Sequence, residues 1–142
     1  MSQPGNNLKD IRILILDDEA GSVGHIRALL AEVAARLEKL DDGGETGMID
    51  LNSLPLAPGE YEQLRQTLGQ GEVSARIEAI GASEIIETRY PGVWWVTHAN
   101  AEGETVAEFI EVTLAPEILK THVEDARTGL ARLRERLTET DP

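Results

Sequence analysis

The sequence predicts an α+β fold with a four-stranded antiparallel meander at about 71–114 and three helices, at about 22–40, 58–68 and 116–137. Two observations favour this class. Apolar residues recur at steps of three and four in the segments expected to be helical, whereas they alternate with polar residues through the central half of the chain. Helices followed by consecutive strands and then by another helix are typical of an α+β layer fold.

The first third of the chain is expected to hold a short strand and then a helix. An apolar, mostly β-branched run near 11–17 ends in acidic residues, which predicts a buried strand. Apolar residues then recur at helical spacing from Ile26 to Leu40, so we expect a helix over 22–40 with Ser22 as its N-cap. The sequence DDGG at 41–44 ends this helix.

The middle of the chain changes from helical to strand periodicity. An apolar run near 47–51 predicts another short strand, and Pro58 begins a helix that ends at Gly69. After Gly71, apolar and polar residues alternate, as in strands with one buried and one exposed face. Turn residues divide this region into four strands, and Pro91 followed by glycine predicts a sharp corner between the second and the third.

The last predicted helix, at 116–137, carries a regular apolar stripe at spacings of three and four: Leu119, Val123, Ala126, Leu130, Leu133 and Leu137. We expect this stripe to pack on the sheet of its own domain. The alternative is a helix-pairing seam or a partner surface, through which a homodimer could form.

Length and composition indicate one globular domain. The chain has 142 residues, of which 41% are hydrophobic and 27% charged, and a chain of this size buries roughly two-thirds of its unfolded surface. We expect residues 1–9 to be a flexible leader and 10–138 to form a single domain. No segment has a signal-peptide pattern or the roughly 20 apolar residues of a membrane span, so a cytoplasmic location is expected.

Charge and cysteine content exclude several functions. The 26 acidic and 13 basic residues give a net charge of −13, which opposes binding to a nucleic-acid backbone or an anionic membrane. The chain has no cysteine, so disulfides, thiolate nucleophiles and cysteine-held zinc or iron–sulfur clusters are excluded. The histidines, His25, His98 and His122, lack ligand spacing, and we expect no metal and no cofactor.

Three aspartates support an alternative function as a phospho-accepting receiver domain. Asp17 and Asp18 follow an apolar run, as in the acidic pocket of a receiver, and Asp50 resembles the phosphoacceptor. The first two would hold a divalent cation while the third attacks a phosphoryl group. The antiparallel pattern at 71–114 weighs against this, because a receiver needs parallel strands separated by helices. The same acids could instead form the carboxylate site of a small-molecule enzyme.

The most distinctive feature is a set of three motifs: GQGEVSARI at 69–77, IETRYPGVWWV at 86–96 and FIEV at 109–112. In this order they resemble the C-terminal conserved domain of the HupH/HyaF family of nickel–iron hydrogenase expression and maturation proteins. The segment IDLNSLPL at 49–56 also resembles that family, so the resemblance covers roughly residues 25–120.

The resemblance implies an accessory protein of hydrogenase maturation rather than an enzyme, with no catalytic residues. It implies a scaffold or chaperone that binds the precursor of the iron–sulfur small subunit or another maturation factor. With its single predicted domain, the chain resembles the shorter members of the family.

Two adjacent tryptophans, Trp94 and Trp95, are the principal binding candidates. Neighbouring strand residues point to opposite faces of a sheet, so one indole should stay exposed if helices cover one face only. Exposed indoles often supply much of the energy of a protein contact. If helices cover both faces, both rings belong to the core instead. The other residues of the predicted binding surface are Glu72, Glu87, Arg89, Tyr90, Pro91 and Glu111.

Overall fold

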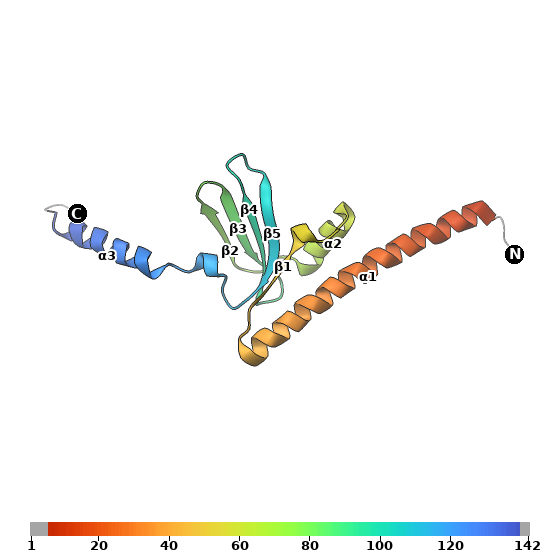
Figure 1. The fold of residues 1–142 in the computed structure, drawn as a ribbon, viewed down its shortest axis with the longest axis horizontal. Helices are drawn as coiled ribbons and strands as arrows, with labels where there is room; N and C mark the ends of the chain where they lie inside the picture. The colour runs from red at the N-terminus through yellow and green to blue at the C-terminus, as the bar shows by residue number, and fades with distance from the viewer. Residues whose placement is uncertain (1–5, 140–142) are drawn as a thin grey trace.

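The computed structural model describes residues 6–139, with side chains from Gly24 onward. The elements are α1 (Asn6–Gly43), β1 (Gly47–Asp50), the 3₁₀ helix η1 (Leu51–Ser53), α2 (Pro58–Leu68), β2 (Ser74–Glu78), β3 (Ala82–Glu87), β4 (Val93–Ala99), β5 (Thr105–Val112), the 3₁₀ helix η2 (Glu117–Leu119) and α3 (Val123–Leu137). The predicted α+β class is therefore confirmed, and Figure 1 shows the arrangement.

The described strands form one antiparallel sheet in the order β1-β5-β4-β3-β2. Strands β2 to β5 are the predicted meander, in which each strand pairs with the next along the chain. Strand β1 adds a fifth member at the edge beside β5, where Ile49 lies opposite Ile110. The predicted short strand near 47–51 is thus part of the same sheet as the meander.

The predicted strand near 11–17 is wrong, because these residues lie within the long helix α1. A short apolar run cannot be assigned to a strand or a buried helix by periodicity alone. No glycine or proline interrupts the sequence from Asn6 to Ala20, so one helix continues through the run. Of the predicted leader, residues 1–5 lie outside the described part of the chain, and residues 6–9 begin α1.

Helices α1 and α2 cover one face of the sheet, which we call the inner face (Figure 1). The main core lies between these layers and contains buried residues of both helices and of β1, β4 and β5. Helix α1 contributes Ile26, Leu29 and Val33, and α2 contributes Leu64 and Leu68. Their spacings of three and four place them on one side of each helix, as the sequence predicts.

A second, smaller cluster lies on the opposite face of the sheet, the outer face. Its buried members are Ile85, Trp94 and Val96, and partly buried residues packed against them are Ala75, Ile77, Phe109 and Leu119. Leu119 belongs to η2, so the chain that follows β5 returns across part of this face. Among the described residues, no α-helix lies on the outer face.

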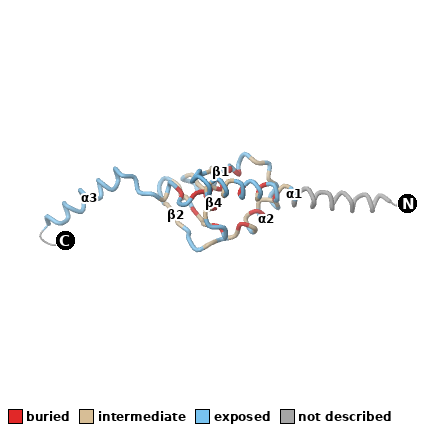
Figure 2. Tube along the Cα trace, turned by 90° about the horizontal axis from the view of Figure 1, so that it is seen from below, coloured by how far each residue is buried: buried red, intermediate tan, exposed pale blue. Residues whose placement is uncertain are grey.

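The last predicted helix differs from the structure in its start and in its packing. Pro116 is instead the N-cap of the short η2, and α3 starts only at Val123. Of the apolar stripe expected to pack on the sheet of its own domain, Leu119 does so from η2, whereas the expectation is wrong for the members from Val123 to Leu137. Every residue of α3 is exposed, and the helix extends away from the sheet (Figure 2).

Candidate functional site

The corner between β3 and β4 is built as the proline–glycine pair predicts. The backbone N–H of Val93 donates to the carbonyl of Tyr90 at 2.9 Å, which closes a turn with Pro91 and Gly92 at its centre. Gly92 has a φ of 95°, a left-handed value that favours glycine. Proline before such a residue is typical of a type II turn, so the sequence itself determines this corner.

Two further hydrogen bonds hold the corner on the rest of the domain, and a third lies within the corner. The N–H of Arg89 donates to the carbonyl of Leu68 at the end of α2, at 2.8 Å. The N–H of Thr113 donates to the carbonyl of Gly92 at 2.9 Å. The buried Thr88 hydroxyl accepts from the N–H of Tyr90 at 3.1 Å. The corner is therefore fixed to α2 and to the segment after β5.

Apolar side chains surround this corner at the surface. Tyr90 is 46% exposed and Leu114 is 82% exposed, and Pro91 is exposed beside them. A hollow of about 540 Å³ lies between Pro91, Leu114 and Leu37 of α1. A second hollow, of about 210 Å³, lies between Tyr90 and α1 and is also lined by Leu37. We call Leu37, Tyr90, Pro91 and Leu114 the corner surface.

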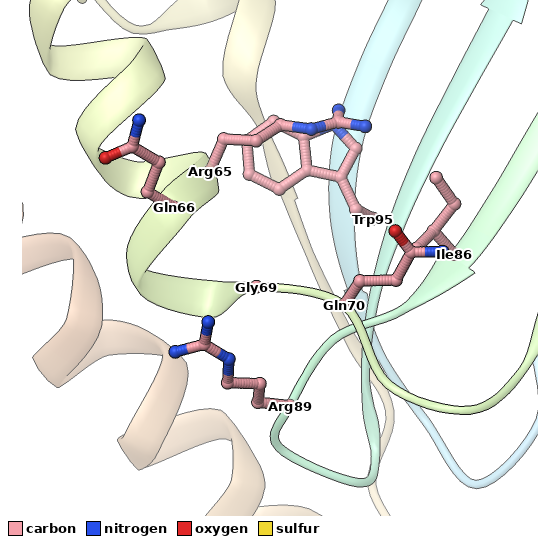
Figure 3. A pocket seen from close by; sticks show the side chains of 7 residues that line it. All are labelled: Arg65, Gln66, Gly69, Gln70, Ile86, Arg89 and Trp95. Carbon is pink, nitrogen blue, oxygen red and sulfur yellow. The ribbon is translucent and has the colours of Figure 1, made fainter.

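A third hollow, of about 300 Å³, opens where α2 ends near β3 and β4 (Figure 3). It is lined by Arg65, Gln66, Gly69, Gln70, Ile86, Arg89 and Trp95. The Arg65 guanidinium lies over the Trp95 ring, with its central carbon 4.8 Å from the ring centroid. Arg89 reaches it from the corner and packs against Gly69. Two cationic groups, Arg65 and Arg89, thus line this hollow in a chain of net charge −13.

A buried carboxylate joins α2 to the inner face of the sheet. Glu108 of β5 is 8% exposed and accepts hydrogen bonds from the Tyr61 hydroxyl at 2.5 Å and from Nε1 of Trp95 at 2.7 Å. Arg65 lies 3.6 Å from the same carboxylate oxygen. Tyr61 also meets Trp95 edge to face, with ring centroids 5.6 Å apart. The buried carboxylate of Glu108 is thus hydrogen-bonded on the inner face, as burial of a polar group requires.

The environment of Tyr61 favours its protonated form. Burial, followed by the hydrogen bond to Glu108 and the charge of that carboxylate, raises the pKa of Tyr61 from 10.0 to about 12. On the outer face, burial raises the pKa of Glu111 above its ordinary value, although a hydrogen bond from the backbone N–H of Glu117 opposes this increase.

Both tryptophans are buried, so the expectation that one indole stays exposed is wrong. Trp94 is 6% exposed and Trp95 is 3% exposed. The two rings do lie on opposite faces, as the pleat requires. Trp95 packs under α2, whereas Trp94 donates from Nε1 to the Thr113 carbonyl at 3.1 Å and packs against Leu119 of η2. The segment after β5, rather than a long helix, covers the second ring.

The other residues of the predicted binding surface lie in different places. Tyr90 and Pro91 are exposed at the corner, and Arg89 lies beside them. The Glu87 carboxylate accepts hydrogen bonds from the backbone N–H groups of Glu72 and Val73, at 3.2 and 3.3 Å. Glu87 therefore fixes the backbone directly before β2. Together with Glu111 it lies on the outer face. The structure therefore brings together only the corner residues of the predicted set.

The aspartates of the receiver alternative do not form its site. Asp50 ends the edge strand β1 in an antiparallel sheet, and its carboxylate accepts from the N–H of Asn52 at 3.0 Å. Asp17 and Asp18 lie in α1, and their side chains are outside the described part of the chain. A receiver requires a parallel sheet, so the antiparallel sheet contradicts that alternative.

Two further observations concern the described residues only. No group of three or more His, Asp or Glu side chains among them is arranged to hold a metal ion. No helix within residues 6–139 combines the length and the apolar character needed to cross a membrane.

The sequence-based prediction missed Glu108, Tyr61 and Arg65. The signal for Glu108 is its position: it shares the alternation of Ile110 and Val112, so a charged residue stands where an inward apolar one is expected. A buried charge needs polar partners. Helix α2 packs on the same face of the sheet and supplies them through Tyr61 and Arg65. Leu37 and Leu114 have no comparable signal, because only the tertiary fold brings them to the corner.

Comparisons with known proteins find similar sequences over most of the chain. The family described as "HupH hydrogenase expression protein, C-terminal conserved region" matches residues 24–140. A hydrogenase expression/formation protein HoxQ of Cupriavidus necator is 30% identical over 108 residues, or 76% of this chain and 38% of its own length. A hydrogenase expression/formation protein HupH of Rhizobium leguminosarum is 27% identical over 111 residues, or 78% of this chain and 39% of its own length.

A solved structure has the same fold. It is the hydrogenase expression protein HupH from Thiobacillus denitrificans, which is 45% identical and superposes with a TM-score of 0.77. The match covers 80% of this chain and 95% of the solved one. The chain thus spans about two-fifths of the length of the two curated relatives and nearly all of the solved one.

Proposed function

We propose, for a chain that belongs to the HupH family of hydrogenase expression proteins, that it is a non-catalytic accessory protein of nickel–iron hydrogenase maturation. Its relatives carry the description of hydrogenase expression and formation. The partner we propose is the precursor of the iron–sulfur small subunit, with another maturation factor as the alternative. The corner surface is the site through which it would bind.

The exposed corner surface is the observation that carries this proposal. Tyr90, Pro91 and Leu114 present apolar groups beside two hollows, on a backbone that three hydrogen bonds hold in place. A preorganised aromatic anchor loses little conformational entropy on binding. Tyrosine is among the residues that most often dominate binding energy. Arg89 borders the surface and can orient an acidic group of the partner.

The proposed mechanism is protection of a partner surface. The chain has no cysteine, so it cannot ligate an iron–sulfur cluster through thiolates. Its contribution to an iron–sulfur subunit is therefore to cover an apolar region until that subunit has received its cofactors. Both tryptophans are buried, which moves the proposed contact from the indoles to the corner.

Co-purification with the hydrogenase small-subunit precursor tests this proposal. The tagged 142-residue chain and the precursor are produced together, and we expect the wild-type chain to retain the precursor. The double variant Tyr90→Asp/Leu114→Asp should lose it. Ile80→Asp is the matched control, because Ile80 is 89% exposed on the β2–β3 turn, away from the corner.

Two outcomes would overturn the proposal in different ways. If the wild-type chain does not retain the precursor, the small subunit is not the partner. If the double variant retains it as well as Ile80→Asp does, the corner surface is not the site. Circular dichroism of each variant establishes that the fold is intact before retention is compared.

A further inference from the structure

Two apolar surfaces of this chain are wholly or partly uncovered by the described residues. One is the α3 stripe, formed by Val123, Ala126, Leu130, Leu133 and Leu137. The other is the outer face, where Met48, Ile77 and Phe109 surround the buried Trp94 cluster. We propose that the α3 stripe of one copy packs on the outer face of a second copy, and that the exchange is reciprocal in a twofold dimer.

The α3 stripe needs an apolar partner. Its leucines, at 130, 133 and 137, are 47%, 60% and 69% exposed. A helix of 15 residues is marginal in water without tertiary packing. The stripe repeats every seven residues, which is the pattern of a helix that buries one narrow face against another element.

The outer face is long enough to hold α3. Helix α3 is about 22 Å long at 1.5 Å per residue, and the seven residues of β4 extend over about 23 Å. Residues of β2, β3, β4 and β5 contribute to the face. Of the elements within residues 6–139, only η2 crosses it, and Figure 1 shows α1 and α2 on the other side of the sheet. A helix can therefore lie along the strands there.

The charges of the two surfaces are complementary. Helical spacing places Arg127 and Arg134 along one edge of the α3 stripe and Arg136 along the other edge. The register of the sheet places three acidic residues on the outer face, at Asp50, Glu87 and Glu111. Arg127 and Arg134 form no ion pair within the described residues, whereas Arg136 contacts Glu139.

The connection between η2 and α3 favours a second copy over the chain's own sheet. Leu119 is packed on the outer face, and the backbone at Lys120 and His122 is extended, with ψ values of 133° and 141°. This connection directs α3 away from its own sheet (Figure 1). Direct pairing of two antiparallel α3 stripes is disfavoured, because it would place the arginines of one helix opposite those of the other.

Light scattering after size exclusion of the 142-residue chain tests the exchange. We expect a mass twice the 15.5 kDa of one chain. Leu130→Asp/Leu133→Asp should reduce it to that of one chain, and so should Met48→Lys/Ile77→Lys on the outer face. Thr128→Asp is the control, because it adds one negative charge on the opposite side of α3 and should remain a dimer.

Mixing the two monomeric variants distinguishes the exchange from other dimers. The leucine variant keeps an intact outer face, and the lysine variant keeps an intact stripe, so the mixture should regain dimers held by one of the two contacts. A monomeric wild-type chain would overturn the proposal. It would indicate that the α3 stripe packs on the sheet of its own chain or stays exposed. A dimer that survives the leucine substitutions, or variants that do not complement each other, would also overturn it.

Discussion

Replacing Glu108 by glutamine tests the buried contact that holds α2 on the sheet. Glutamine has a similar shape and can still accept hydrogen bonds, but it removes the negative charge that Tyr61 and Trp95 now share at 2.5 and 2.7 Å. A hydrogen bond to a charged group contributes about 1 kcal/mol more than a neutral one. For two such bonds, we expect the free energy of unfolding to fall by about 2 kcal/mol and the Tm by about 6 °C.

The same substitution should change the ionisation of Tyr61. Burial and Glu108 together raise the pKa of Tyr61 from 10.0 to about 12. Without the carboxylate, the pKa should fall but stay above 10.0, because burial remains. The raised pKa also predicts a stabilising contribution that is complete below pH 10.0 and lost as the pH rises through about 12.

Two measurements check this prediction. Urea unfolding gives the change in free energy, and an absorbance titration follows tyrosine ionisation. The chain has two tyrosines, so a Tyr90→Phe background leaves Tyr61 alone to be observed. Glu102→Gln, an exposed carboxylate in the β4–β5 turn, is the control. Unchanged unfolding together with an unchanged titration of Tyr61 would refute the role assigned to Glu108.

Two further substitutions test the corner and the packing of α1 on α2. Gly92→Ala should reduce the free energy of unfolding by about 1–2 kcal/mol, because φ at this position is 95° and the added Cβ would lie 3.1 Å from the Leu37 side chain. Urea titration measures this change, and an unchanged midpoint of urea unfolding would contradict the prediction. A hydrogen bond from the Ala57 N–H, followed by one from His25, lowers the pKa of Glu60 from 4.5. Stability should therefore be lost as the pH falls below 4.5, and Glu60→Gln should remove that part of the pH dependence.

Local patterns predicted the elements whose neighbours lie close in sequence. The alternation after Gly71 predicted the meander because each strand pairs with the next, and the proline–glycine pair predicted the corner because the turn depends on these residues alone. The helix at 58–68 is confirmed at both ends, since Pro58 starts it and Gly69 follows it. The family resemblance, based on motifs in the same region, is also confirmed.

The parts that were not predicted depend on packing between distant segments. The run at 11–17 has no local feature that separates a strand from a helix, and α1 continues through it. Trp94 is buried because residues after β5 return across the outer face, which no alternation pattern reveals. The spacing of apolar residues in α3 predicts an amphipathic helix, but it does not determine which surface the apolar side packs against.

The affinity of the chain for the hydrogenase small-subunit precursor, measured by calorimetry, tests the central claim most directly. Tyr90 at the corner surface is 46% exposed and available as an anchor. A dominant contact residue contributes about 2 kcal/mol, so Tyr90→Ala should weaken binding about thirtyfold, while Ile80→Ala should leave the Kd unchanged. Equal Kd values for wild type and Tyr90→Ala, or a similar loss in Ile80→Ala, would contradict the assignment of the corner surface as the binding site.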